Sequence, residues 1–408
     1  MKIGLLGQFG SGNSGNDGSL EAMVRFLHRA RPEAELLCIC SNPAKVRNDF
    51  SLSVVSIRGK TLERATRSSR LWRLPARLGG MISIFHALAG TDILVIPGTG
   101  ILDDFQETPF GWPFILFWWC LAARLRGIRI AFVSIGAGPI HNALSRRFLK
   151  AAVQMAQYRS YRDDFSLNYV RNMGVDVSRD LRFPDLAFSL RTPVRDPVRD
   201  RRPVHAAIGI GVMLYRGWKR NQADGDAIYR TYIDKISTVI IRLLEDGHRV
   251  HLFMGDKADE KTLDDICNGL PSRPAGASHA FVSAARTASL EEVMEEVKKV
   301  DVAIVSRYHN LLCSLKTGRP TFSLGYAQKN DELMAEFGRG AFCQHIENFD
   351  VTVLIRQVRD ALADLDSAGE AIERHNASIR QALARQEELL LSNVLQEQPL
   401  RHRTTVRT

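Results

Sequence analysis

Short apolar segments that alternate with helical stretches run through almost the whole chain, and this alternation constrains the fold more than any other feature. Residues 2–6, 92–96, 129–135 and 302–305 are continuous hydrophobic runs with the length and composition of strands buried on both faces. Stretches with helical periodicity follow such runs, as at residues 143–156. The pattern predicts an α/β protein built on parallel, doubly wound sheets.

The alternation is interrupted by RTPVRDPVRDRRP at residues 191–203, which contains three prolines and many charges. A segment of this composition is typical of a linker between domains. We therefore predict two Rossmann-like domains that face each other across a cleft. The expected parts are a first domain at 1–190, a linker at 191–204, a second domain at 205–366, a C-terminal helix at 367–396 that packs back across the first domain, and a disordered tail at 397–408.

The charge balance restricts the class of partner. The formal net charge of +10 suits nucleic acid, an anionic membrane or a small phosphorylated substrate. The cations are mostly scattered, and the chain has neither zinc-ligand spacing nor an RNA-binding aromatic motif. We therefore expect no nucleic-acid partner.

Cysteine usage and the first residues indicate the compartment. The six cysteines lie singly or alternate along an expected strand, which is typical of free thiols in a reducing environment. Met1 and Lys2 lead directly into a strand without a signal-peptide pattern. The most apolar segment, residues 110–123, is shorter than the roughly 20 residues that span a bilayer. These features predict a cytoplasmic protein.

The segment 301–326 carries the clearest candidate site. It places Arg307 and His309 at the carboxyl end of an expected strand, before a helix expected at 311–317. Ligands bind at this edge of open α/β sheets, and a helix N-terminus favours anions. We predict that both side chains bind or act on a negatively charged ligand. The alternative is a surface ion pair for Arg307 and local packing for His309.

The glycine-dense residues 7–18 are expected to form a loop whose backbone approaches a ligand closely. Gly10, Gly12 and Gly15 have the spacing of a dinucleotide-binding fingerprint, but no acidic residue suited to a ribose follows the second strand. The loop also lacks the Gly-Lys-Ser/Thr sequence of a P-loop. We expect no nucleotide cofactor.

A set of motifs in a fixed order resembles the polysaccharide pyruvyl transferase family. Its pieces span most of the chain, and the order of the set is more specific than any single piece. The matching segments are GNSGNDGSL at 12–20, PGTGILDD at 97–104, SIGAGPI at 134–140, YRDDFSL at 161–167, PDLA at 184–187, SRYH at 306–309, Gly318-x-Pro320 and Tyr326-x-x-Lys329. In the first of them the family's usual Gly-Asp order appears as Asn16-Asp17-Gly18.

The resemblance implies a two-domain fold like that of GT-B glycosyltransferases and a ketal-forming transferase activity. The donor would be phosphoenolpyruvate, whose pyruvyl group is attached to two hydroxyls of a sugar with release of phosphate. By resemblance Arg307 binds the donor carboxylate or phosphate, and His309 is the general acid. A histidine suits proton transfer to the methylene carbon of the donor. No step requires a metal ion.

Further residues at strand ends are candidates for the same site. Arg162, Lys329 and Lys219 are expected to bind the donor, because arginine and lysine bind phosphate and carboxylate groups. An ion pair with a neighbouring aspartate is the alternative for Arg162, and a solvated loop is the alternative for both lysines. The candidates for binding acceptor hydroxyls are Asn13, Asp17, Asp103 and Asp104, whose alternative is a turn or helix-cap role.

The aromatic residues between Phe110 and Trp119 have two interpretations. A helix buried in the first domain is favoured. The alternative is a patch on the inner face of the cell membrane, close to a lipid-linked sugar acceptor, with nearby arginines suited to anionic lipid. An acceptor linked to a nucleotide is also compatible with the sequence. The sequence makes no prediction of the oligomeric state.

Two other functions compete with the transferase. A GT-B nucleotide-sugar glycosyltransferase needs an acidic residue placed for a ribose, and Glu291 and Glu292 instead have the position of helix-start residues. A non-catalytic carbohydrate-binding subunit has no need of both Arg307 and His309.

Overall fold

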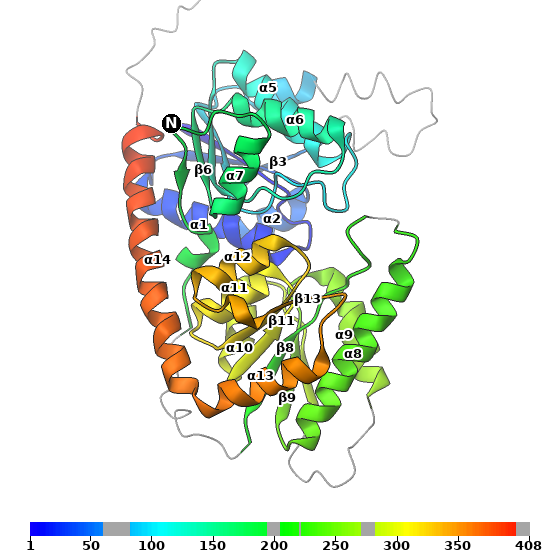
Figure 1. Cartoon of the computed structure of the whole chain (residues 1–408). Helices are drawn as coiled ribbons and strands as arrows, with labels where there is room; N and C mark the ends of the chain where they lie inside the picture. The colour runs from blue at the N-terminus through cyan, green and yellow to red at the C-terminus, as the bar shows by residue number, and fades with distance from the viewer. Residues whose placement is uncertain (60–81, 194–204, 220–221, 271–281, 397–408) are drawn as a thin grey trace, which may run out of the picture.

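The computed structural model describes residues 1–59, 82–193, 205–219, 222–270 and 282–396. These residues form two α/β domains, each built on one parallel sheet (Figure 1). The prediction of two parallel, doubly wound α/β domains is confirmed. Most of the expected linker and the expected disordered tail lie outside the described residues.

The first domain contains a seven-stranded sheet in the order β3-β2-β1-β4-β5-β6-β7. Its strands are β1 (Lys2–Leu6), β2 (Glu35–Cys40), β3 (Ser53–Ser56), β4 (Ile93–Pro97), β5 (Arg129–Ile135), β6 (Tyr158–Tyr161) and β7 (Leu181–Arg182). Its helices are α1 (Ser14–Ala30), α2 (Pro43–Phe50), α5 (Trp112–Leu125), α6 (Ala143–Gln154) and α7 (Asp164–Asn172), followed by the 3-10 turn η2 (Leu186–Ser189).

The second domain contains a six-stranded sheet in the order β10-β9-β8-β11-β12-β13. Its strands are β8 (Ala207–Gly211), β9 (Arg249–Phe253), β10 (Val282–Ala285), β11 (Val302–Val305), β12 (Thr321–Gly325) and β13 (Cys343–His345). Its helices are α8 (Gly225–Glu245), α9 (Glu260–Gly269), α10 (Leu290–Lys298), α11 (Tyr308–Lys316), α12 (Gln328–Glu336) and α13 (Val351–Ala363), with 3-10 turns η4 (Lys257–Asp259) and η5 (Gly340–Phe342).

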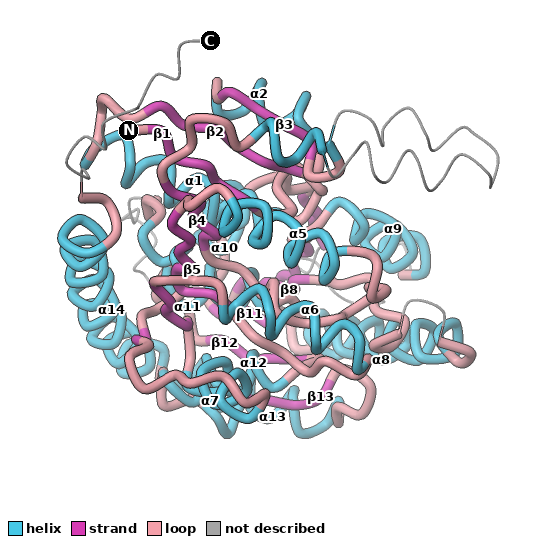
Figure 2. The backbone as a smooth tube through the Cα atoms, turned by 90° about the horizontal axis from the view of Figure 1, so that it is seen from above, coloured by secondary structure: helices cyan, strands magenta, loops and turns pink. Residues whose placement is uncertain are grey.

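Both sheets reverse their winding direction beside their first strand, between β1 and β4 and between β8 and β11. Ligands of open α/β sheets bind outside the carboxyl ends of the strands at such a reversal. Helix α1, which follows β1, packs against α10 of the second domain, and Figure 2 shows the two helices one above the other. The carboxyl ends of β1 and β4 therefore face the second domain.

Helix α14 (Leu365–Asn393) runs along one side of both domains (Figure 1). Asn376 donates hydrogen bonds to the carbonyls of Leu315 and Lys316 in the second domain, at 3.0 and 3.3 Å. Ten residues further on, the buried Gln386 donates to Ser134 and Ser160 of the first domain, at 2.8 and 3.1 Å. Two buried amides on one rigid helix thus fix the position of one domain relative to the other.

Helix α1 begins at Ser14, earlier than the start near residue 19 that the glycines indicated, so the expected loop at 7–18 is shorter than predicted. Asn13 caps the helix by accepting hydrogen bonds from the amides of Gly15 and Asn16. A Cβ at Gly15 would overlap the imidazole of His309, and one at Gly18 would overlap Leu290. Residues larger than glycine do not fit at these two positions, because the second domain packs closely on the helix.

Two other boundaries differ from the sequence prediction. Helix α11 begins at Tyr308 instead of residue 311, so His309 lies in its first turn. Helix α12 lies in a segment for which no element was predicted, and it places Lys329 in its first turn, whereas a solvated loop was the alternative considered for this lysine. Both changes bring a helix N-terminus, with its partial positive charge, to the edge of the interface between the domains.

Candidate active site

Arg162 follows β6 directly and is buried between the two domains. Its Nη1 donates to Oδ2 of Asp185 at 3.1 Å, and its Nε lies 3.4 Å from Oδ2 of Asp163. The guanidinium carbon lies 4.0 Å from the centre of the Tyr308 ring, which belongs to the second domain. Burial lowers the pKa of Arg162, but Tyr308, Asp185 and Asp163 raise it by more, so the pKa stays above its ordinary value and the side chain stays charged.

His309 lies against the N-terminus of α1, where Gly15 leaves room for its ring. Its Nε2 is buried without a hydrogen-bond partner and lies 3.9 Å from Oδ2 of Asp185. Burial lowers the pKa of His309 to about 4; Asp185 opposes this change, and Arg162, Lys329 and Arg307 add to it. The imidazole is therefore neutral near pH 7, and Asp185 lies between it and Arg162.

The loop after β4 has an unusual backbone. Gly98 has φ of +56° and Thr99 has φ of +64°, a left-handed conformation that a β-branched residue rarely adopts. The loop is held there by hydrogen bonds from the Gly98 amide to the Val133 carbonyl and from the Gly136 amide to the Thr99 carbonyl, both 2.7 Å long. This conformation sets the position of Gly100.

Three charged groups converge on the open side of Gly100. A Cβ built on Gly100 would lie 3.5 Å from Oδ2 of Asp103, 3.6 Å from Nη2 of Arg162 and 3.9 Å from Nζ of Lys329. Lys329 is half-buried, and among the residues that the structure describes it forms no ion pair within 4 Å. Burial raises the pKa of Asp103, while Lys329 and Arg162 lower it in part. Two cations and one carboxyl group therefore lie around Gly100.

Arg307 occupies the N-cap position of α11 without a capping hydrogen bond from its side chain, and its guanidinium contacts its own domain. Its Nε and Nη2 donate to the two carboxylate oxygens of Asp259, at 2.8 and 2.6 Å, and its Nη1 lies 3.5 Å from Asp256. Asp259 also accepts from the amide of Leu214, at 2.7 Å. The expectation that Arg307 binds the donor stays a prediction, and this geometry favours a positioning role for it.

All four expected acceptor-binding residues use polar atoms within the protein, and Asp103 does so through Oδ1, which accepts from the amide of Phe105 at 3.2 Å. Asn13 caps α1, as described above. Asp17 accepts from the Gly10 amide at 2.6 Å and pairs with Lys45 at 2.8 Å. Asp104 accepts from the amides of His141 and Asn142, at 3.1 and 2.8 Å. These contacts match the turn and cap roles considered as alternatives, and they leave Asp103 as the carboxyl group that faces the cations.

Lys219 lies in the loop after β8, with an exposed side chain. Its neighbour Trp218 belongs to an aromatic cluster that joins the two domains. The ring of Phe105 from the first domain lies 4.9 Å from Trp218 and 5.3 Å from Tyr326 of the second domain. Nζ of Lys329 lies 4.7 Å above the Tyr326 ring. Aromatic side chains thus flank the lysine of the anion site.

Sequence analysis missed Asp185, Tyr308 and the aromatic cluster as parts of the site. Asp185 carries a detectable signal, because it is an acidic residue shortly after the strand pair β6 and β7, in a segment that also matched the family motif. Tyr308 lies between two residues that were identified. The contact of Phe105 with Trp218 has no signal in the sequence, because 113 positions separate the two.

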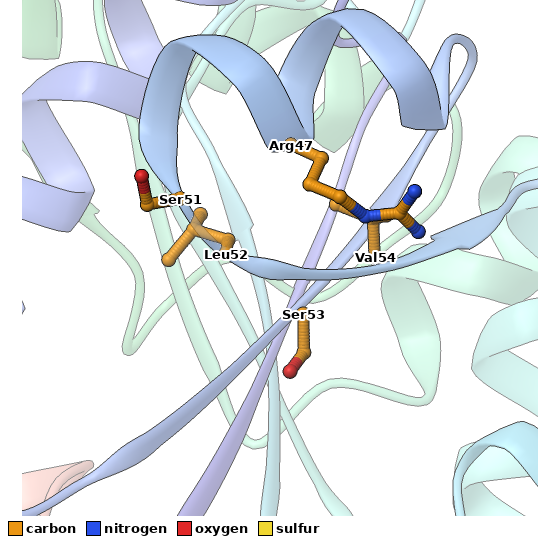
Figure 3. A pocket seen from close by; sticks show the side chains of 5 residues that line it. All are labelled: Arg47, Ser51, Leu52, Ser53 and Val54. Atoms are coloured by element: carbon orange, nitrogen blue, oxygen red, sulfur yellow. The ribbon is translucent and has the colours of Figure 1, made fainter.

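Two further regions do not contribute to this site. An open depression of about 640 Å³, lined by Arg47 and residues 51–54, lies at the outer edge of the first sheet (Figure 3). Glu292 accepts from the Ala288 amide at 2.7 Å, and its own amide donates to the hydroxyl of the N-cap residue Ser289, so it is engaged at the start of α10.

The described residues contain no group of three or more His, Cys, Asp or Glu side chains arranged to hold a metal ion. None of the helices in the described part of the chain has the length and apolarity needed to cross a bilayer.

Comparison with known proteins gives one family and one fold. The family model of polysaccharide pyruvyl transferase matches residues 13–328. A search of curated proteins finds no match. Among solved structures, a putative UDP-N-acetylglucosamine 2-epimerase from Listeria monocytogenes is similar with a TM-score of 0.59 and 13% identity, covering 98% of this chain and 99% of that chain.

Two other structures share the fold at similarly low identity. The UDP-GlcNAc 2-epimerase from Neisseria meningitidis bound to UDP-GlcNAc has a TM-score of 0.60 and 11% identity, covering 96% of this chain and all of that chain. The lipopolysaccharide outer core galactosyltransferase WaaB in its apo form has a TM-score of 0.54 and 13% identity, covering 95% of this chain and all of that chain. These similarities confirm the GT-B-like arrangement of the two domains.

Proposed function

Because the chain belongs to the polysaccharide pyruvyl transferase family, as its ordered motifs predicted, we propose that it transfers a pyruvyl group from phosphoenolpyruvate onto two hydroxyls of a sugar. The products are a cyclic pyruvate ketal and phosphate. The observation that carries the proposal is the convergence of Arg162, Lys329 and Asp103 around Gly100.

The donor is a small trianion whose phosphate and carboxylate are both attached to its central carbon. Arg162 and Lys329 supply two positive charges at the site, and Nη2 of Arg162 is directed toward the space at Gly100. The N-termini of α1, α11 and α12 add partial positive charge near the same place. This arrangement binds a compact anion without a metal ion or an organic cofactor.

The reaction requires one proton on the methylene carbon of the donor and the loss of one proton from each sugar hydroxyl. In our proposal His309 gives its proton to the methylene carbon, while the first hydroxyl oxygen bonds to the central carbon. The bond between that carbon and the phosphate oxygen then breaks, and the second hydroxyl closes the ring. One hydroxyl proton restores His309, and the other leaves with the phosphate, so the atoms and charges balance.

His309 is neutral before the donor binds, because burial and three nearby cations lower its pKa. The negative charge of the donor favours the protonated imidazole and raises that pKa. The histidine therefore becomes an acid only when the donor is present, which protects the site from unproductive protonation.

On the acceptor side, Asp103 is placed to accept a hydrogen bond or proton from a sugar hydroxyl. It lies beside Arg162 and Lys329 around Gly100, and burial raises its pKa toward the range of a useful base. Phe105 follows Asp103 by two residues, and its ring contacts that of Trp218 in the second domain. We propose a sugar unit of a polysaccharide or glycolipid precursor as the acceptor and a cytoplasmic location for the reaction.

A nucleotide-sugar glycosyltransferase is the second candidate, because the similar structures include a galactosyltransferase and an epimerase bound to UDP-GlcNAc. Glu292, one of the two acids considered for a ribose, is engaged at the start of α10. The candidate is retained as an outcome of the test below.

The test is a thermal-shift series with phosphoenolpyruvate, UDP-glucose, UDP-galactose and NADH, followed by an assay of phosphate release in the presence of sugar acceptors. Phosphoenolpyruvate is expected to raise the melting temperature of the protein, and Arg162→Lys is expected to reduce that increase. Stabilisation by a UDP-sugar alone would replace the proposal with the glycosyltransferase. Stabilisation by both would identify an activated sugar as the acceptor.

A further inference from the structure

We propose that the outer face of the first domain docks on an anionic lipid bilayer and that the acceptor is a lipid-linked sugar. This face, called here the α5–α6 face, consists of the helical residues 82–87, helix α5 with the preceding Phe110, and helix α6. The identity of the acceptor rests on the proposed function, whereas the docking surface stands on separate observations.

Large apolar side chains are exposed on the α5–α6 face. Five such side chains are exposed by more than a third among the described residues, and four of them belong to this face. The exposed fractions are 59% for Ile82, 37% for Phe85, 57% for Phe110 and 68% for Leu125. The fifth is Leu181 on β7, at 36%.

Contacts between rings join part of this surface, and the remaining side chains lie at the other end of α5. Phe110 lies 5.8 Å from Phe114 and 6.1 Å from Phe148 of α6, measured between ring centres. Phe85 lies beside the other end of α5, where the Arg126 guanidinium is 4.6 Å from its ring. Leu125 follows Phe114 by a nearly whole number of helical turns and so lies on the same side of α5.

The core side of α5 is distinct from this surface. Trp112 and Trp119 are buried, and their indole nitrogens donate to the carbonyls of Ile101 and Ile57, at 3.0 and 2.9 Å. The buried-helix interpretation therefore describes these two tryptophans, while Phe110, Phe114 and Leu125 occupy the opposite side. Because the inner side already forms the core, the apolar residues of the outer side serve another purpose.

The charges of the α5–α6 face have one sign. Neither α5, α6 nor residues 82–87 contain an aspartate or glutamate. Exposed cations lie at both ends of the face, with Arg124 at the end of α5 and Arg146 and Arg147 in α6. The acid in the preceding loop, Glu107, is exposed, but both of its carboxylate oxygens accept hydrogen bonds, from the Trp112 amide at 3.3 Å and from Nε2 of Gln8 at 3.2 Å.

Aromatic and aliphatic side chains flanked by arginines, without acids, match the interface of an anionic bilayer. A partner protein or a second copy of this chain has acidic groups of its own and pairs charges of both signs. The charge pattern therefore favours a lipid surface over a protein surface.

The position of the α5–α6 face connects it to the active site. Figure 1 shows α5 and α6 in the outer layer of the first domain, and both helices start from loops at the carboxyl edge of its sheet. The loop after β4 carries Asp103 and Gly100 and leads to Phe110. Asp104 of that loop also binds the amides of His141 and Asn142, and Asn142 caps α6. A sugar whose lipid anchor lies in the bilayer under Phe110 is thus close to the site.

Vesicle sedimentation of the full chain tests the docking surface without any donor or acceptor. The vesicles contain phosphatidylcholine alone or phosphatidylcholine with about 30% phosphatidylglycerol, so that only the second kind carries negative charge. The protein is expected to sediment with the anionic vesicles. The double variant Phe110→Asp/Leu125→Asp is expected to lose about tenfold or more of this binding. The matched control is Leu181→Asp, which adds the same charge at an exposed leucine outside the face and is expected to bind like the parent.

Three results would overturn the proposal: no binding of the parent protein, equal binding of the double variant, or equal loss in Leu181→Asp. Light scattering without vesicles adds a fourth, because a dimer that the double variant converts to a monomer would show that the face binds a second copy. The thermal shift with phosphoenolpyruvate uses the same proteins and no lipid. If the parent protein binds the anionic vesicles but shows no thermal shift with phosphoenolpyruvate, the proposed function alone is rejected. If it shows the thermal shift but does not bind the vesicles, the docking surface alone is rejected.

Discussion

Arg162 of the first domain and Arg307 of the second both lie between a strand and a helix, yet the structure gives them different surroundings. Each follows a parallel strand and precedes a helix that points toward the domain interface. Arg307 donates two short hydrogen bonds to one carboxylate, that of Asp259. Arg162 makes one contact each with Asp185 and Asp163, and its Nη2 is directed at the space beside Gly100.

The difference shows that the pairing of a cation decides its availability to a ligand. An anion that binds Arg307 directly has to displace Asp259 from a buried bidentate pair, and breaking such a pair costs about 3–5 kcal/mol. An anion that binds Arg162 at Nη2 leaves both existing contacts in place. The position after a strand is the same for both residues, so the carboxylate partners make the difference.

The largest effect is expected from His309, whose ring lies near both arginines. His309→Gln removes the proton donor but keeps a polar side chain of similar length. The turnover number is expected to fall by about 10²- to 10⁴-fold, the usual contribution of a general acid. Phosphate release with a saturating acceptor measures it, and calorimetry of donor binding is the control, with affinity expected within a few-fold of the parent. Near-normal turnover would remove the histidine from the mechanism.

Arg162→Lys tests the arginine that faces the ligand. The charge is kept, but the planar fork and the stacking on Tyr308 are lost. The dissociation constant of phosphoenolpyruvate is expected to rise by about 10- to 100-fold, since a hydrogen bond to a charged group contributes about 1.5–3 kcal/mol. Circular dichroism establishes that the variant folds. An unchanged affinity would place Arg162 outside the donor site and would break the comparison.

Gly100→Ala tests whether the donor occupies the space where the charges converge. The added methyl group lies 3.5 Å or more from Asp103, Arg162 and Lys329, so the free protein accommodates it. Donor affinity is expected to fall by about tenfold because the methyl group occupies the ligand's space. The matched control is Gly269→Ala, where no atom lies within 4 Å of the new Cβ. A similar affinity for Gly100→Ala and the parent would move the donor elsewhere.

The sequence predicted the fold because its strands are buried on both faces and therefore appear as continuous apolar runs, such as residues 129–135. It also predicted that Arg162, His309 and Lys329 lie at or after the ends of strands. The structure brings these three residues close to one another. It did not predict the early start of α1, because the reason for Gly15 and Gly18 is packing by the second domain. Nor did it predict the pairing of Arg307 with Asp259, which depends on a contact between residues 48 positions apart.

The pH dependence of donor binding reports on the proton of His309. The free protein holds this group neutral, with its pKa lowered to about 4 by burial first. If the donor raises that pKa, binding takes up a proton at any pH between the two values. Donor affinity then falls as pH rises through this window, by at most about tenfold per pH unit.

Calorimetry in buffers with different ionisation enthalpies measures the proton uptake. The phosphate of the donor titrates too, so the difference between the parent and His309→Gln isolates the histidine. Equal uptake in the two proteins would show that His309 stays neutral in the complex and acts as a base or a hydrogen-bond donor instead.

Arg307→Lys is expected to have the smallest effect on donor binding, and it decides the comparison. A lysine keeps the charge beside Asp259 but makes one hydrogen bond where the arginine makes two. The loss of one such bond costs about 1.5–3 kcal/mol, so the melting temperature is expected to fall by several degrees. Donor affinity is expected to stay within about threefold of the parent. A loss of affinity as large as that of Arg162→Lys, without loss of thermal stability, would mean that the donor displaces Asp259 and that the sequence-based assignment of Arg307 to donor binding is right.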